Sequence, residues 1–125
     1  MSGSPSSTPV GGIAAAISND VVRILHSQTG RGPAHAKTVI NGDLVVCLLH
    51  DTLTVGERTL VESGQSQAVL NVRQLYQRAM RAELSGAVEA RIGRRVVAFM
   101  SDNHIDPDTA VEVFLLESRG ASQDE

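Results

Sequence analysis

Apolar residues recur every three or four positions along two long segments of the chain, which is the spacing of a helix with one buried face. The segments span about residues 9–28 and 66–92. Gly30 and Gly93 follow them, at the position where a left-handed residue commonly ends a helix. The pattern therefore predicts two amphipathic helices. Their apolar stripes include Ile13, Ile17, Val21 and Ile24 in the first, and Val69, Val72, Met80, Leu84 and Val88 in the second.

A capping box predicts a third, short helix between these two. The Thr54 hydroxyl is placed to accept a hydrogen bond from the backbone N–H of Glu57, and the Glu57 carboxylate can accept from the backbone N–H of Thr54. Ser63-Gly64 interrupts the segment that follows. We expect this helix to end at about Glu62.

Four shorter apolar runs predict strands at about residues 36–40, 43–49, 95–101 and 111–117. Asn41-Gly42 lies between the first two runs and is the strongest short signal of a β-hairpin. Both of its residues readily adopt the positive φ that a type I′ turn requires. The order α-β-β-α-α-β-β predicts a two-layer α+β fold. We expect a mostly antiparallel four-stranded sheet with one long helix packed on it.

The strand runs do not alternate between apolar and polar residues. Leu44 to Leu49 and Val96 to Met100 are apolar at nearly every position, whereas a sheet with one solvated face normally alternates. We therefore expect both faces of the sheet to be covered, either by helices alone or by helices on one face and a second subunit on the other. Two substantial helices and a short one are few for two faces, so the pattern favours a homodimer.

Composition narrows the class of protein. The 125 residues predict one domain, residues 10–118, with disordered tails at 1–9 and 119–125. A net charge of −3 argues against nucleic-acid binding. Cys47 is the single cysteine, which excludes an intramolecular disulfide and favours a reducing, cytoplasmic setting. No apolar run approaches the roughly 18 residues of a membrane-spanning helix.

The segment Gly30-Arg31-Gly32-Pro33 is the first candidate site. Glycines allow backbone N–H groups to converge on an anion, Arg31 adds a forked cation, and Lys37 follows closely. Arg31, Gly32 and Lys37 are therefore candidate ligand-binding residues. The alternative is a simple helix stop and chain reversal, with Arg31 paired to a structural carboxylate, and the shortness of the motif favours that alternative.

The polar segment 101–108 is the second candidate site. Asp102, Asp106 and Asp108 could hold Mg2+ or Ca2+, but the spacing does not match an EF-hand. The simpler interpretation is that Asp106 caps a helical turn with Pro107 in its first position. On that interpretation we expect neither a metal nor another cofactor.

The first half of this segment, Ser101-Asp102-Asn103-His104, is less easily explained as a turn. Asp102 could orient His104 as an acid/base pair, although Ser101 lacks the pattern of a nucleophile elbow. An exposed loop histidine is the commoner explanation. We therefore regard Ser101, Asp102, Asn103 and His104 as candidates for binding a ligand or partner.

Neither the remaining histidines nor the arginines form a recognisable motif. Six arginines between residues 73 and 95 are interrupted by glutamates, so a solvated helix face with ion pairs is favoured over a nucleic-acid surface. The four histidines lack the spacing of a zinc site. We expect Cys47, inside an apolar strand, to pack as a small hydrophobic residue.

Several of these features, in this order, resemble the MpsC-like family of small bacterial proteins over about residues 13–117. The features are Gly30-Arg31-Gly32-Pro33, Lys37, Asn41-Gly42-Asp43, Leu53-Thr54 with Glu57 and Leu60, Gly93-Arg94, Ala98-Phe99-Met100-Ser101-Asp102 and Glu112-Val113-Phe114. The family is named for a Na+-translocating system that generates a membrane potential. The chain departs from the family pattern at Asp51, where Gly is usual, which puts the geometry of that turn in question.

The resemblance implies a non-catalytic binding or regulatory protein, a soluble component associated with a membrane ion or bicarbonate transport system, with a membrane transport protein as partner. It implies no catalytic residues. An alternative is an enzyme for a small anionic substrate, with Arg31 and Lys37 binding the anion and Asp102 and His104 moving protons. That alternative requires all four residues to meet in one pocket.

Overall fold

The computed structural model describes residues 9–30, 33 and 35–118, and within them the predicted order of elements is confirmed. Residues 1–8 and 119–125, which belong to the predicted tails, lie outside the described residues. The elements are α1 (Pro9–Thr29), β1 (His35–Asn41), β2 (Leu44–His50), α2 (Val55–Glu62), α3 (Ser66–Ile92), β3 (Val96–His104) and β4 (Thr109–Leu116). None of the described helices is long and apolar enough to cross a membrane.

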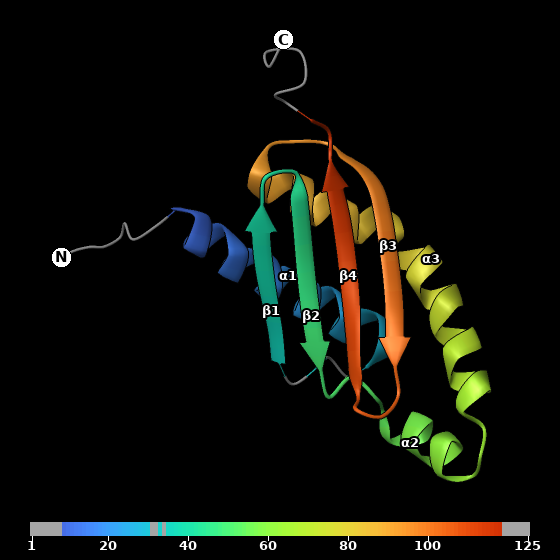
Figure 1. Ribbon diagram of the computed structural model, residues 1–125. Helices are drawn as coiled ribbons and strands as arrows, with labels where there is room; N and C mark the ends of the chain where they lie inside the picture. Colours follow the sequence, from blue (N-terminus) through green and yellow to red (C-terminus); the bar gives the residue numbers. More distant parts are fainter. Residues whose placement is uncertain (1–8, 31–32, 34, 119–125) are drawn as a thin grey trace, which may run out of the picture.

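The four strands form one antiparallel sheet in the order β1-β2-β4-β3 (Figure 1). The second hairpin therefore lies with β4 beside β2, and β1 and β3 become the two edges. The register aligns side chains in rows across the sheet. One such row joins Val39, Val46, Val113 and Met100.

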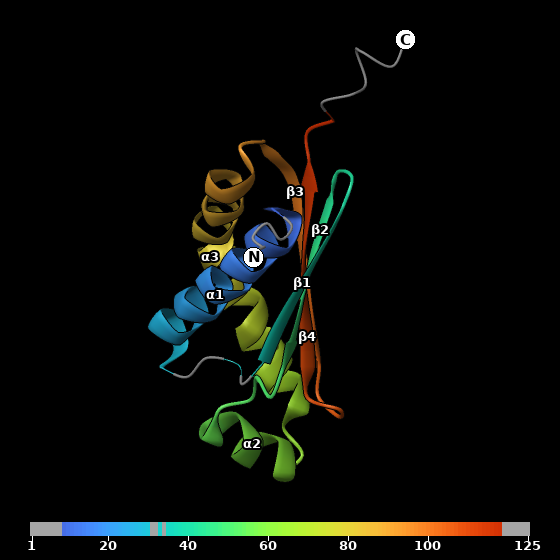
Figure 2. The same ribbon diagram turned by 90° about the vertical axis from the view of Figure 1, so that its left-hand side faces the viewer.

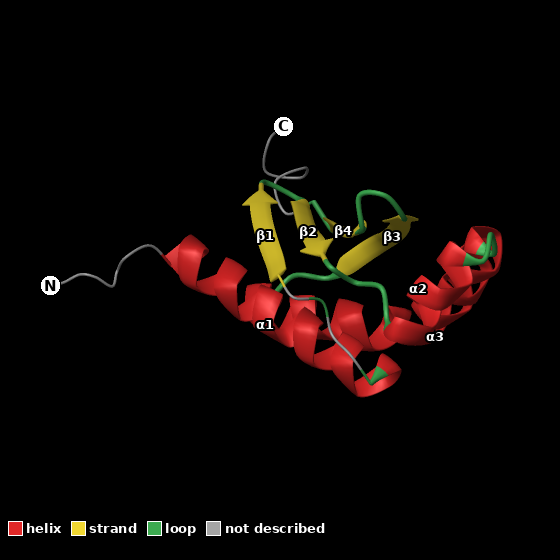
Figure 3. Ribbon diagram, turned by 90° about the horizontal axis from the view of Figure 1, so that it is seen from below, coloured by secondary structure: helices red, strands yellow, loops and turns green. Residues whose placement is uncertain are grey.

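All three helices lie on one side of the sheet (Figures 2 and 3). Helix α1 packs against β1, and α3 packs against both α1 and β3. The core between the layers is almost entirely aliphatic, with Phe114 as its largest buried side chain. Its members include Ile17, Val21, Ile24, Val45, Cys47, Leu49, Met80, Leu84, Val88 and Leu116. Thus the helices cover one face of the sheet, and the alternative in which helices alone cover both faces is wrong.

The two faces of strand β2 differ in burial although its residues are apolar on both. Val45, Cys47 and Leu49 are buried under the helices, while Leu44 and Leu48 point to the other side and remain 41% and 39% exposed. Burial therefore alternates along the strand although hydrophobicity does not. The sheet has an apolar face that nothing in the described part of the chain covers.

The predicted helix ends are confirmed. Thr54 caps α2, its hydroxyl accepting from Glu57 N over 3.1 Å, and the Glu57 carboxylate accepts from Thr54 N over 2.9 Å. Gly30 and Gly93 follow α1 and α3 with φ of 80° and 78°. These left-handed conformations are ones that glycine adopts without steric cost.

The first hairpin is confirmed, but its turn is displaced by one residue from the prediction. Asn41 belongs to β1 and pairs with Leu44, so Gly42 and Asp43 form the two-residue loop. Only Gly42 has positive φ, at 62°. A positive φ at the first loop residue alone is typical of a type II′ turn rather than the expected type I′.

The segment 101–108 also differs from the prediction. Ser101–His104 continue strand β3, and residues 105–108 form the turn to β4. The predicted helical start at Asp106 and Pro107 is wrong. Local turn chemistry favoured a loop here, but cross-strand pairing of Asp102 with Val111 and of His104 with Thr109 extends the strand.

Candidate functional site

A cavity of about 380 Å³ lies on the helix side of the sheet. It is bounded by the C-terminal end of α1, by α2, by the first half of α3, and by the ends of three strands. Its walls are mainly apolar, and polar groups from α3, β3 and β4 face into it. The apolar lining includes Leu25, Leu49, Leu60, Val72, Met80 and Ala110. The volume is within the range of pockets that bind small molecules.

Glu112 is the most unusual residue of this cavity. It is 2% exposed and alternates along β4 with buried Ala110 and Phe114, so its side chain must point into the helix side. Its Oε1 is buried and has no hydrogen-bond partner among the described residues. Burial raises the pKa of Glu112 to about 7, and the nearby Ser101 hydroxyl and Arg73 guanidinium offset only part of that rise. The carboxyl can therefore change protonation state near neutral pH.

Ser101 lies directly opposite Glu112 in the β3–β4 pair. Its buried hydroxyl lies near enough to the Glu112 carboxyl to favour the ionised form, although neither this hydroxyl nor Glu112 Oε1 makes a hydrogen bond of normal length within the described residues. Two unsatisfied polar groups on one buried row are costly, because each loses its contact with water without a replacement. A bound molecule with suitable polar atoms would remove part of that cost.

Arg73 frames the cavity from α3. Its Nε and Nη2 donate to the two carboxylate oxygens of Glu57 over 2.9 and 2.6 Å. Its Nη1 donates to Thr52 Oγ1 over 2.9 Å and to Asn103 Oδ1 over 3.1 Å, and Nη2 also donates to the Thr52 carbonyl over 2.8 Å. All five N–H groups of the guanidinium are thereby used. Arg73 thus joins α2, the connection after β2 and strand β3 around the cavity, and it has no donor left for a ligand.

The Glu57 carboxylate contributes to this frame from α2. Burial alone would raise the pKa of Glu57, but hydrogen bonds from Arg73 and from the Thr54 backbone outweigh it and hold the pKa below its usual value. Glu57 is therefore ionised at neutral pH. Both carboxyls are substantially desolvated, which alone would raise the pKa of each. The pKa of Glu57 is lowered, whereas that of Glu112 is raised, because only Glu57 has strong hydrogen-bond partners.

Asp108 fixes the turn at the same end of the sheet. Its Oδ1 accepts from the backbone N–H and hydroxyl of Thr52 over 2.9 and 2.8 Å, and its Oδ2 accepts from Leu53 N over 3.0 Å. Burial opposes ionisation, but these hydrogen bonds and the charge of Arg58 hold the pKa of Asp108 below its usual value. Asp108 thus binds the connection that follows β2.

The strand conformation of Ser101–His104 divides these four candidates between two faces. Ser101 and Asn103 face the helices, and Asn103 lines the cavity. Asp102 and His104 are exposed on the opposite face. Asp102 Oδ1 accepts from the backbone N–H of Asn103 over 2.9 Å. His104 Nδ1 lies 2.9 Å from the Pro107 carbonyl oxygen.

Lys37 shares the open face with Asp102 and His104 but lies on the opposite edge strand. Strands β1 and β3 are separated by two strands. At the usual strand spacing, Lys37 on β1 is therefore about 14 Å from Asp102 on β3. Arg31 and Gly32 lie outside the described residues. Asp102 and His104 are neighbours on one face of β3, but Lys37 does not converge with them as the enzyme alternative requires.

No group of three or more His, Cys, Asp or Glu side chains in residues 9–30, 33 and 35–118 is arranged to hold a metal ion. Asp102 and Asp108 in particular face different surroundings. Burial raises the pKa of the Cys47 thiol to about 11, so this residue packs as a neutral side chain, as predicted.

Glu112 and Arg73 were not among the predicted site residues. Glu112 lies within an apolar run, and its alternation with Ala110 and Phe114 puts all three on one face of the strand without showing which face is buried. Arg73 was grouped with a solvated helix face, and its partial burial contradicts that. Its partners Thr52 and Asn103 are distant in sequence, so no local signal identifies it.

The sequence profile of one protein family matches residues 10–118, and its description is "Na+-translocating membrane potential-generating system (MpsC)". The chain is also similar to "Uncharacterized protein YrhF" of Bacillus subtilis (strain 168). The two are 24% identical over 110 residues, which cover 86% of this chain and 90% of that protein. No solved structure matches the chain significantly.

Proposed function

The chain belongs to the MpsC family, and from this premise we propose that it is a non-catalytic binding or regulatory component of a membrane ion-transport system. The family description supplies the link to Na+ translocation and membrane potential. We place the protein on the cytoplasmic side, where a membrane transport protein is its partner. The single reduced cysteine, buried Cys47, fits that location.

The observation that carries the binding role is the unpaired Glu112 carboxyl oxygen in the cavity. A buried polar atom without a partner is rare in proteins and calls for a hydrogen-bonding group from elsewhere. The cavity has the size and the mainly apolar walls of a small-molecule site. We infer that its ligand is a small molecule with an apolar body and a nitrogen that donates to Glu112.

Charge favours an amine over an acid as that ligand. An ammonium group would stabilise ionised Glu112, whose pKa of about 7 allows either state near neutral pH. An anionic ligand would meet repulsion from the same carboxylate. The Arg73 guanidinium could not compensate with a direct hydrogen bond, because its N–H groups are already used.

Two of the ionisable groups near Glu112 are unsuited to catalysis. Glu57 is held by Arg73, and Cys47 is a thiol with a raised pKa rather than a thiolate. Neither offers a nucleophile or a second proton-transfer group beside Glu112. We propose that occupancy of the cavity is the signal and that ion transport by the membrane partner is the response.

A membrane-vesicle assay tests this proposal. Vesicles are prepared from the source cells with the gene deleted and then complemented, and the Na+-dependent membrane potential is measured with a voltage-sensitive dye. We expect deletion to lower the potential and the wild-type chain to restore it. An unchanged potential after deletion would refute the membrane function.

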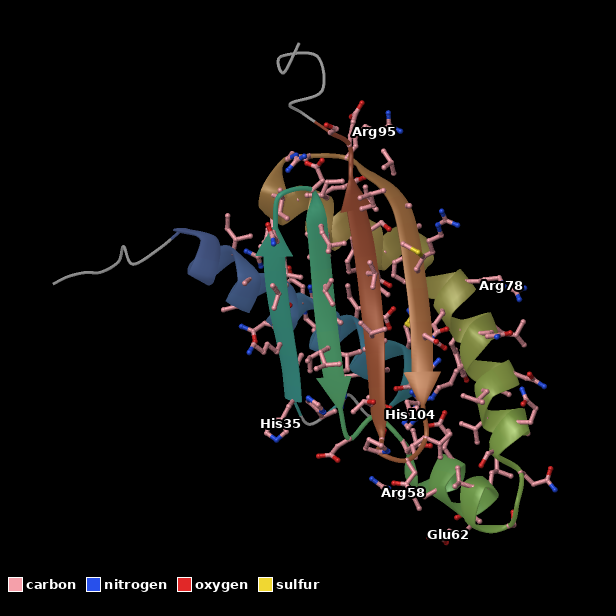
Figure 4. The ribbon with its side chains drawn as sticks, viewed as in Figure 1. His35, Arg58, Glu62, Arg78, Arg95 and His104 are labelled. Carbon is pink, nitrogen blue, oxygen red and sulfur yellow. The ribbon has the colours of Figure 1, made fainter. Side chains whose placement is uncertain are left out.

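Variants separate the cavity from the membrane function in the same assay. We expect Glu112→Gln to restore less than the wild type, because the amide cannot ionise. Glu62→Gln is the matched control, since Glu62 is on the outside of α2 (Figure 4), and it should restore fully. If Glu112→Gln restores as well as the wild type, the cavity is not the regulatory site even though the membrane role stands.

A further inference from the structure

The face of the sheet that lacks helices carries an exposed apolar patch. Val39 and Met100, which lie midway along the two edge strands, are 51% and 54% exposed. The other large members of the patch are Leu44, Leu48, Val97 and Leu115. Exposed apolar clusters of this kind mark interaction surfaces. Figure 2 shows this face free of any described element.

Two opposite charges stand at the two ends of one row on this face. Lys37 of β1 pairs with Leu48, Leu48 with Val111, and Val111 with Asp102 of β3. The row therefore runs from a cation at one edge, through two apolar residues, to an anion at the other. In the described part of the chain, neither Lys37 nor Asp102 forms an ion pair.

A twofold axis parallel to the strands would pair these charges. We propose that two copies of this chain pack open face to open face about such an axis. The rotation places β1 of each copy over β3 of the other and keeps every row at its own level. Lys37 then faces the partner's Asp102, and Asp102 faces the partner's Lys37, so the interface is self-complementary.

The other face-to-face arrangement is disfavoured by the same side chains. A twofold axis perpendicular to the strands would place β1 over β1 and reverse the order of the rows. Lys37 would then lie over the partner's Val39, and Asp102 over the partner's Met100. Burying each charge against an apolar side chain without a partner is costly, which selects the axis parallel to the strands.

The distribution of polarity across the face fits an interface between two copies. The row Val39, Val46, Val113, Met100 is apolar throughout and lies beside the charged row. The terminal row contains His35, His50, Thr109 and His104. His35 and His104 mark its ends on the two edge strands (Figure 4). An apolar centre with a polar rim is the usual organisation of a protein interface.

A second copy explains the open face better than a membrane surface or an unrelated protein. A net charge of −3 does not favour anionic lipid. A heterologous partner would need its own matching anion and cation, whereas a second copy supplies both at the correct spacing. Helices on one face and a second subunit on the other is also the arrangement that the apolar strands favour.

Charge exchange tests the proposal with the full-length chain in sedimentation equilibrium. We expect the wild type to be a dimer and both Lys37→Asp and Asp102→Lys to weaken dimerisation roughly 100-fold, because each creates two like-charge contacts. The double variant Lys37→Asp/Asp102→Lys should return to within about threefold of the wild type, since the pairs are rebuilt in reverse.

The control is Arg78→Asp on the outer side of α3, away from the open face (Figure 4), which should leave the dimer constant unchanged. Circular dichroism of each variant confirms folding, and the rescue by the double variant excludes misfolding as the cause of a loss. A wild type that stays monomeric, or that dimerises only with lipid or another protein present, overturns the proposal. Single variants that dimerise normally, or a double variant that is not rescued, overturn it equally.

Discussion

Arg73 Nη1 donates to Asn103 Oδ1 over 3.1 Å and so joins helix α3 to the end of strand β3. The same guanidinium holds Glu57 at the start of α2. One side chain thus connects three elements around the cavity that Glu112 also lines.

Removing this arginine should destabilise the protein. We expect Arg73→Ala to lower the free energy of unfolding by about 3 kcal/mol, because a largely buried carboxylate loses its partner. Arg73 and Glu57 side chains are only 14% and 17% exposed, so solvent screening is weak. Arg78→Ala on the same helix should stay within about 0.5 kcal/mol of the wild type. Urea unfolding measures both, and equal values would contradict the role of Arg73.

Glu112 should make the protein less stable as the pH rises. Its folded-state pKa of about 7 exceeds the ordinary value of 4.5, so the folded protein holds this proton more tightly than the unfolded chain. The contribution of protonated Glu112 to the free energy of unfolding is fully present below pH 4.5 and is lost as the pH rises through about 7. We expect Glu112→Gln to be more stable than the wild type by about 3 kcal/mol at pH 8, with the gap closing near pH 4.5. Parallel pH profiles for the two proteins would contradict this.

Asp108 should show the opposite dependence on pH. Its pKa is lowered, so its stabilising contribution is present above the ordinary value of 3.8 and is lost as the pH falls through the folded-state value. We expect Asp108→Asn to cost about 2 kcal/mol at neutral pH, because Thr52 loses a charged acceptor. The difference from the wild type should shrink as the pH falls below 3.8 and Asp108 becomes protonated.

Asp106→Asn is the natural comparison for Asp108→Asn. Asp106 is exposed in the same turn, and thermal unfolding of this variant should match the wild type over the whole pH range. A loss of stability in Asp106→Asn as large as that in Asp108→Asn would mean that the turn, rather than the Thr52 contacts, is responsible.

Asp51 occupies a backbone conformation that favours glycine. Its φ is 57°, the one positive φ among the described non-glycine residues. We expect Asp51→Gly to stabilise the protein by about 0.5–1 kcal/mol and Asp51→Ala to destabilise it by a similar amount. Chemical denaturation of the three proteins should therefore rank Gly above Asp above Ala. A ranking with Ala above Gly would show that side-chain contacts decide this position.

The sequence predicted elements well where their signals were local. The Thr54–Glu57 capping box and Gly93 defined helix ends, because the residues involved are neighbours in the chain. The predictions were wrong where distant residues decide the outcome. Asp106 and Pro107 resemble a helix start, but the turn is fixed instead by Asp108, which accepts from the backbone N–H of Thr52, 56 residues away.

The candidate site was harder to predict than the fold. Asn103 was singled out, and it lines the cavity. Asp102 and His104 turned out to lie on the other face, because strand β3 continues past the expected boundary. Glu112 is a candidate site residue because its carboxyl oxygen Oε1 is buried without a hydrogen-bond partner among the described residues. Burial of that kind is a property of the packed helices and cannot be read from any short segment.

The resemblance to the family was confirmed over nearly the whole domain. The family pattern has glycine where this chain has Asp51, and the positive φ of Asp51 is a conformation that glycine favours. The anion-binding role predicted for Arg31, Gly32 and Lys37 stays a prediction, since Arg31 and Gly32 lie outside the described residues.

The most direct measurement is a methyl NMR titration of the full chain with butylamine, 1-butanol and butyrate at about pH 7.5, where Glu112 titrates. The three probes share an apolar body and differ in the polar group offered to Glu112. We expect shifts at Leu49 and Met80, with the amine binding most tightly and butyrate most weakly. Glu112→Gln should reduce the preference for the amine about tenfold, and Glu62→Gln should not change it. Absence of shifts at Leu49 and Met80, tightest binding of butyrate, or an unchanged preference in Glu112→Gln would contradict the proposed site.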